Sequence, residues 1–242
     1  MLACQWPDAD VRAIMLTHPN NPTGLVTPPE NLRSLAEHAA RQGQTVIIDA
    51  SFRGQVRDAQ YDTYAVLDGA GADWIVLEDT GKLWPVHELK IGLLAWSEQC
   101  ELPLQRAFSE SMLGASPVVL QLVEALAGDW ATGGYERARD LVEHNRTVVR
   151  ETIATVGLAL ADPDSQISVA RVELPDGGPD SSRLYQDLLA HGVHVLPCAP
   201  FYWADQASGL RFIRLSLARP TELVRIGAEG LARAYRDLTV PV

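Results

Sequence analysis

The segment VRAIMLTHPNNPTG, residues 11–24, joins an apolar run to a turn rich in proline, asparagine and glycine. The run Val11–Leu16 is typical of a buried strand, and the polar segment His18–Gly24 begins just after it. Backbone preferences alone explain proline and glycine in such a turn. An asparagine held between prolines also presents a fixed amide group, so Asn21 is a candidate ligand-binding residue.

The same arrangement of a buried run followed by polar residues recurs further along the chain. Thr45–Ile48 is followed by Asp49, and Trp74–Leu77 is followed by the polar segment Glu78–Lys82. A lysine held near acidic groups is suited to covalent chemistry on a carbonyl compound. Ligands of open α/β sheets bind at the carboxyl ends of the strands, so Asp49 and Lys82 are predicted to lie at one ligand-binding edge.

Helical and apolar segments between and after these runs indicate the fold class of the first part. Glu30–Gln42 places its apolar residues on one face, and Gly43 ends the pattern. Ile91–Trp96 is a fourth apolar run. Because the runs are continuous rather than alternating, they predict an α/β fold with parallel strands covered by helices on both faces.

The pattern changes near residue 130, where we place a boundary between domains of residues 1–130 and 131–242. The second domain mixes amphipathic helical patterns with separate strand patterns. The predicted elements are Tyr135–Thr155, Ile167–Leu174, Ser181–Ala190, Val193–Leu196, Phe212–Leu217 and Thr221–Tyr235. Arg214 interrupts an apolar strand, a position that usually requires an anionic partner.

Composition excludes several classes of protein. The 242 residues carry a formal net charge of -11, which has the wrong sign for general nucleic-acid binding. Cys4, Cys100 and Cys198 are odd in number and far apart, which favours a reducing compartment over a disulfide framework. With no apolar run of membrane-spanning length, these observations predict a cytoplasmic protein. His191 and His194 with Cys198 straddle a helix end and a strand, so no metal site is predicted.

Taken together, four segments resemble the fold-type I pyridoxal-phosphate enzymes, specifically the class I/II aminotransferases. They match the family's Asn-Pro-Thr-Gly segment, its aspartate strand, its lysine segment and its substrate-arginine strand, at His18–Gly24, Val46–Phe52, Asp79–Gly92 and Phe212–Ala218. The resemblance implies the central part of the aminotransferase large-domain sheet followed by the α+β small domain. Family members carry well over a hundred residues before the first of these segments, so the chain is expected to lack the N-terminal portion.

The resemblance assigns roles to the matched residues, with pyridoxal 5'-phosphate as cofactor. Lys82 would bond covalently to the cofactor aldehyde and move the proton between substrate and cofactor. Asp49 would pair with the pyridinium nitrogen. Asn21 would hydrogen-bond the ring's phenolic oxygen and lie against the substrate, and Arg214 would hold the substrate α-carboxylate.

Three positions depart from the family pattern. Asp79 stands where a serine or threonine usually binds the cofactor phosphate, so Thr80 is the candidate replacement. Lys90 stands for a phosphate-binding arginine and keeps its charge without the guanidinium fork. Phe52 stands for a tyrosine beside the ring and lacks its hydroxyl group.

The predicted function is therefore a pyridoxal-phosphate-dependent aminotransferase acting on an amino acid and a 2-oxo acid. Two other hypotheses stay open: a cofactor-free degenerate paralogue or fragment acting as a binding subunit, and a pyridoxal-phosphate lyase, decarboxylase or cyclase. We expect a homodimer or a complementing chain, and neither nucleic-acid nor membrane partners.

Overall fold

The computed structural model describes residues 10–84, 86 and 91–239. The chain divides into two compact units, and each is described by itself. The first unit runs to Tyr135, except for the four residues Asn21–Gly24, which belong to the second unit together with the chain from Glu136 onward.

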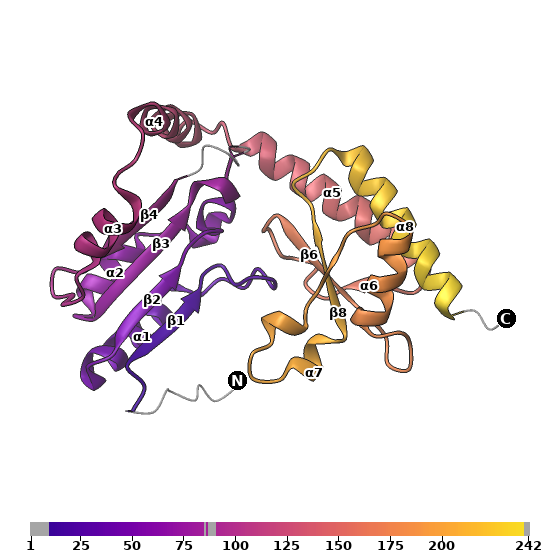
Figure 1. Ribbon diagram of the computed structural model, residues 1–242, viewed down its shortest axis with the longest axis horizontal. Helices are drawn as coiled ribbons and strands as arrows, with labels where there is room; N and C mark the ends of the chain where they lie inside the picture. The colour runs from indigo at the N-terminus through magenta and orange to yellow at the C-terminus, as the bar shows by residue number, and fades with distance from the viewer. Residues whose placement is uncertain (1–9, 85, 87–90, 240–242) are drawn as a thin grey trace. The chain divides into compact units, whose positions relative to one another are not determined.

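The first unit is built on a four-stranded sheet in the order β1-β2-β3-β4 (Figure 1). Its strands are β1 (Ala13–Thr17), β2 (Thr45–Asp49), β3 (Asp73–Asp79) and β4 (Gly92–Trp96). The first three strands are parallel, as predicted, with Ile14 opposite Val46 and Val46 opposite Trp74.

The fourth strand corrects the prediction of an all-parallel sheet, because β4 runs antiparallel to β3. The main-chain N–H of Thr80 donates to the carbonyl of Ile91 at 3.1 Å, so the chain returns at the same edge where β3 ends. An apolar run has the same appearance in the sequence whichever way the strand points. The hydrophobic pattern therefore located the strand without giving its direction.

Helices pack on one face of this sheet. α1 (Pro29–Gln42) ends at Gly43, whose φ of 65° is the left-handed conformation that favours glycine. α1 and α2 (Thr63–Gly69) share a core with the sheet, formed by Leu32, Ala36, Ala39, Val46, Ile48, Val66, Leu67, Trp74 and Val76, among others. On the opposite face Met15 of the edge strand β1 is 57% exposed, whereas Ile75 of β3 is 6% exposed.

Two further helices complete the first unit. α3 (Leu104–Met112) and α4 (Pro117–Ala131) contain no buried residue among the described part of the chain. No single described helix is long and apolar enough to cross a membrane. α3 and α4 together reach that length and composition but are bent by 118° at the break between them.

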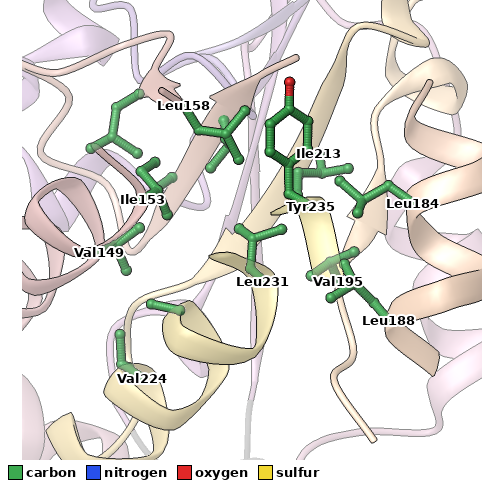
Figure 2. Close-up of a cluster of buried hydrophobic side chains, with 14 of the residues drawn as sticks. Val149, Ile153, Leu158, Leu184, Leu188, Val195, Ile213, Val224, Leu231 and Tyr235 are labelled. Atoms are coloured by element: carbon green, nitrogen blue, oxygen red, sulfur yellow. The ribbon is translucent and has the colours of Figure 1, made fainter. Parts of the chain in front are cut away.

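The second unit packs helices on an antiparallel sheet in the order β5-β6-β8-β7. The strands are β5 (Ala159–Leu160), β6 (Val169–Glu173), β7 (Leu196–Pro197) and β8 (Phe212–Ser216), and the helices are α5 (Glu136–Ala154), α6 (Ser181–Ala190), α7 (Gln206–Gly209) and α8 (Thr221–Thr239). Figure 2 shows the shared core, where Ile153, Leu184 and Leu231 from three helices meet Ile213 of β8. This mixture of elements agrees with the predicted α+β class.

Candidate functional site

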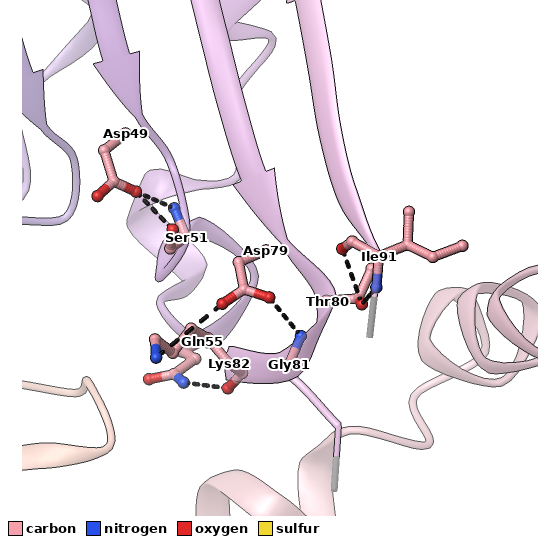
Figure 3. A network of polar contacts seen from close by, with 8 residues as sticks. All are labelled: Asp49, Ser51, Gln55, Asp79, Thr80, Gly81, Lys82 and Ile91. Atoms are coloured by element: carbon pink, nitrogen blue, oxygen red, sulfur yellow. Dashed lines mark hydrogen bonds and ion pairs between the residues drawn. The ribbon is translucent and has the colours of Figure 1, made fainter. Parts of the chain in front are cut away.

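Lys82 lies in a single 3-10 turn, Thr80–Lys82, directly after β3. The buried side-chain amide of Gln55 donates to the main-chain carbonyl of Lys82 at 2.6 Å (Figure 3). The Lys82 side chain is 48% exposed, and its Nζ lies 4.0 Å from Asp79 Oδ2. The backbone of this lysine is therefore fixed, while its amine is open to a reactant.

Asp79 caps the turn that carries Lys82. Its carboxylate accepts the main-chain N–H of Gly81 at 2.8 Å and lies on the same side as the Lys82 amine (Figure 3). A serine or threonine is able to cap the turn in the same way, since each offers a side-chain oxygen. The unusual residue at this position therefore keeps the local geometry and adds a negative charge.

Thr80 has both hydrogen-bonding functions of its hydroxyl engaged with Ile91. The hydroxyl donates to the Ile91 carbonyl at 3.0 Å and accepts the Ile91 N–H at 2.8 Å, and the residue is 4% exposed. The phosphate-binding role predicted for Thr80 stays a prediction, and it requires these bonds to rearrange.

Asp49 ends β2, and Ser51 orients its carboxylate. The Ser51 N–H and hydroxyl donate to Asp49 Oδ1 at 3.0 and 2.5 Å (Figure 3). Within the part of the chain that the structure describes, the other oxygen, Oδ2, accepts no hydrogen bond. Phe52, three residues on, is buried with 4% exposure.

His18 supports the same edge from β1. Its main-chain N–H donates to the Asp49 carbonyl at 2.8 Å, and its ring Nδ1 accepts the Thr27 N–H at 3.1 Å. The ring is 1% exposed. Burial, helped by the positive charge of Arg53, lowers the pKa of His18 from 6.5 to about 4, so the ring is neutral at neutral pH.

A cavity of about 310 Å³ opens beside this edge of the sheet. Ser51, Asp79 and Thr80 contribute to its lining. The other lining residues are Ala50, Arg53, Gly54, Gln60, Glu78, Leu83, Trp84, Leu93, Val123, Ala127 and Trp130.

Arg214 and Asn21 form a second group, which lies in the second unit. Arg214 Nη1 donates to Asn21 Oδ1 at 2.8 Å, and its guanidinium stacks over the Phe201 ring at 4.7 Å. Among the described residues this neutral amide, and no carboxylate, is the hydrogen-bond partner of Arg214. Desolvation lowers the pKa of Arg214 from its ordinary value. The half-buried cation is thus left without a countercharge from the described chain.

The loop that presents Asn21 has an unusual backbone geometry. The Asn21–Pro22 and His18–Pro19 peptides are both cis. Gly24 has a φ of 76°, and a Cβ atom there would collide with the side chain of Ser165. The glycine is therefore required by both backbone conformation and close packing.

A second arginine, Arg171, lies beside Arg214 and was not foreseen from the sequence. The two are directly opposite each other in the register of β6 and β8. Asp162 holds Arg171 through two bonds, Nε to Oδ2 at 2.8 Å and Nη2 to Oδ1 at 3.0 Å. Arg171 is the polar residue between Ala170 and Val172 in its strand, which was the available signal.

The structure thus brings most predicted residues into two groups. Asp49, Phe52, Thr80 and Lys82 belong to the first unit, while Asn21 and Arg214 contact each other in the second. Lys90 lies outside the described residues. Sequence reasoning missed Ser51 and Gln55, whose roles depend on contacts that no spacing rule encodes. Among the described residues no group of His, Cys, Asp and Glu could hold a metal ion.

Comparison with known proteins identifies the family of the chain. The family "Aminotransferase class I and II" matches residues 4–231. Curated relatives include an aspartate/prephenate aminotransferase of Thermus thermophilus, 24% identical over 92% of this chain and 56% of its own length. A valine–pyruvate aminotransferase of Mycobacterium tuberculosis is 24% identical over 88% of this chain and 54% of its own length. The chain therefore spans little more than half the length of these relatives.

Solved structures give the same result. MppP, in a structure soaked with the product 2-ketoarginine, superposes with a TM-score of 0.90 and 41% identity, covering 94% of this chain and 64% of MppP. A Thermus thermophilus aspartate aminotransferase variant superposes with a TM-score of 0.78 and 22% identity, over 94% of this chain and 58% of its own, and shows the fold alone. With a family match over nearly its whole length, this chain belongs to the class I and II aminotransferases.

Proposed function

We propose that this chain carries the reactive lysine and the substrate-binding arginine of an enzyme that interconverts an amino acid and its 2-oxo acid. The observation that carries the proposal is the setting of Lys82, a half-exposed amine on a backbone held by the buried Gln55. An amine in this setting is available for covalent chemistry on a carbonyl group.

The cofactor of this family is pyridoxal 5'-phosphate, and the chemistry of the residues present fits its ring. Asp49 supplies a carboxylate that suits a protonated ring nitrogen. Ser51 holds one of its oxygens, and the other has no hydrogen bond within the described chain. Asn21 uses its oxygen to accept from Arg214, so its amide N–H groups are left to donate to the phenolic oxygen. When bound, the cofactor supplies an aldehyde and an electron sink.

Each residue then has a defined task. Lys82 holds the cofactor and afterwards takes and returns the proton at the substrate Cα. Asp49, oriented by Ser51, keeps the ring nitrogen protonated through its negative charge. Arg214, oriented by Asn21 and Phe201, binds the substrate α-carboxylate through its guanidinium fork.

The phosphate end is expected to bind weakly. Asp79 places a negative charge beside the position expected for phosphate, and the Thr80 hydroxyl is engaged with Ile91. Lys90 is the cation proposed to offset this charge. We therefore expect a lower cofactor affinity than a serine at position 79 would give.

One observation favours a particular substrate. MppP, which is 41% identical to this chain, was solved with the product 2-ketoarginine. That compound is the 2-oxo acid of arginine, so arginine and related guanidino amino acids are candidate substrates. The names of the curated relatives add acidic amino acids such as aspartate and apolar amino acids such as valine.

Association with further polypeptide is also part of the proposal. The exposed apolar residues of the first unit include Met15 on the edge strand β1 and Leu93 and Trp96 on the edge strand β4. Exposed sheet edges and apolar helices without buried residues favour association. A second copy, or the part of the family fold that this chain does not span, would cover them.

The experiment is an absorbance titration of the purified chain with pyridoxal phosphate, followed by addition of arginine, aspartate or valine. A lysine-bound cofactor has a visible absorbance band, which the reacting amino acid should bleach with release of its 2-oxo acid. A band that no amino acid changes would leave cofactor binding without the proposed reaction. Absence of the band at saturating cofactor would contradict the proposal itself.

A further inference from the structure

Two arginines face each other on the side of the second sheet that is turned away from its core. In β6 and β8 the core takes Ala170, Val172 and Ile213. Because side chains alternate along a strand, Arg171 and Arg214 occupy the opposite face, where the register pairs them directly. Like charges directly opposite one another destabilise a sheet, so this pair requires compensation.

Asp162 provides the compensation for one arginine alone. It binds Arg171 through two bonds of 2.8 and 3.0 Å, while the Arg171 guanidinium also donates to the Tyr202 hydroxyl and stacks over Phe212 at 4.3 Å. The Arg171 side chain is only 12% exposed. Arg171 is thus neutralised and immobilised, whereas Arg214 meets no carboxylate among the described residues.

We propose that Asp162 is a specificity-determining residue that restricts the Arg214 site to substrates carrying a single carboxylate. The inference rests on the proposed function, in which Arg214 binds the substrate α-carboxylate. With Asp162 charged, the site offers one free cation. Without that charge, Arg171 becomes a second cation beside the first, and a ligand with two carboxylates gains a partner for each.

The known product of the similar structure fits this restriction. 2-Ketoarginine has one carboxylate, and its other end is a cation, which an uncompensated Arg171 would repel. Asp162 therefore serves two purposes, because it removes the attraction for a second carboxylate and the repulsion of a cationic side chain.

The test compares two probes that differ by one carboxylate. 2-Oxopentanoate and 2-oxoglutarate both have five carbons, and only the second has a terminal carboxylate. Calorimetric titration of each into the purified full chain gives an affinity ratio that does not depend on turnover. Asp162→Asn should tighten 2-oxoglutarate relative to 2-oxopentanoate about tenfold or more, as expected for a new charge-assisted hydrogen bond.

Matched variants separate this effect from a general change of charge. Glu173→Gln removes an equal charge from β6, the strand that carries Arg171. Glu173 pairs with Arg211 at 3.0 Å, and its loss should leave the ratio within about twofold of the original. Adding Arg171→Met to Asp162→Asn should abolish the gain. An unchanged ratio in folded Asp162→Asn, or an equal gain in Glu173→Gln, would overturn the proposal.

Arg171→Met and Arg214→Met provide two further tests, and the second separates this proposal from the proposed function. If Asp162→Asn does not fold, Arg171→Met alone decides: a selective loss of 2-oxoglutarate binding would show that Arg171 already serves a second carboxylate and would overturn the proposal. An unchanged ratio supports it. Arg214→Met should weaken both probes, and if it weakens neither, the proposed function fails at this site.

Discussion

His18 should make the first unit sensitive to mild acid. Its ring is buried against Tyr61 and Thr27 at the edge that carries Asp49, and burial lowers its pKa from 6.5 to about 4. In the unfolded chain the ring regains its ordinary pKa. Between pH 6.5 and 4 the unfolded state therefore binds one more proton than the folded state, and stability falls as the pH is lowered.

The size of the effect follows from the two pKa values. Each unit of difference between them is worth about 1.4 kcal/mol, so the His18 contribution lost on acidification is about 3 kcal/mol. The loss begins as the pH falls below the unfolded value of 6.5 and is complete below about 4. This is a large fraction of the stability of an ordinary domain.

The assay is urea unfolding at a series of pH values, followed by tryptophan fluorescence. Four of the five tryptophans in the described part of the chain belong to the first unit, so the signal reports mainly on the unit that contains His18. His18→Gln retains an acceptor for the Thr27 N–H and should flatten the stability curve between pH 6.5 and 4. The matched control His144→Gln changes an exposed histidine of α5 and should leave the curve unchanged. Parallel curves for the original chain and His18→Gln would refute the reasoning.

Two other substitutions test the candidate site. Asp79→Ser keeps the cap on Gly81 and removes a charge, so pyridoxal phosphate should bind tighter by roughly 1 kcal/mol in an absorbance titration; unchanged affinity would show that Asp79 does not face the phosphate. Gly24→Ala should cost about 1–3 kcal/mol of unfolding free energy of the second unit, measured by urea unfolding with circular dichroism, because a positive φ and a clash with Ser165 add together. Gly157→Ala has the positive φ with open space around it, so its cost should be smaller, and equal costs would contradict the packing argument.

Much of the fold could be predicted from hydrophobic pattern and chain punctuation. α1 is found where the apolar face of Glu30–Gln42 predicted it, and Gly43 ends it with a left-handed conformation. The parallel strands β1, β2 and β3 overlap the predicted apolar runs. Boundaries were less accurate, since β7 lies at Leu196–Pro197 rather than Val193–Leu196.

The features that were not predicted have physical explanations. α3 was not predicted, and it buries no residue within the described chain, so no core-facing pattern marked it. The direction of β4 could not be predicted, because an apolar run looks the same in the sequence whichever way the strand points. Asn21 was predicted because it follows a strand, and Arg214 because it interrupts an apolar strand. The structure shows that the two side chains contact each other. The pairing of Asp162 with Arg171 could not be predicted, because it joins a loop to a strand through tertiary contact.

The central claim is that Lys82 is the residue that binds the cofactor. The chain has only two lysines, Lys82 and Lys90, so covalent labelling gives a clear answer. Borohydride reduction in saturating pyridoxal phosphate, followed by peptide mass mapping, should place the label on Lys82, and Lys82→Arg should lose it. Label on Lys90 instead, or no label on either lysine, would contradict the account.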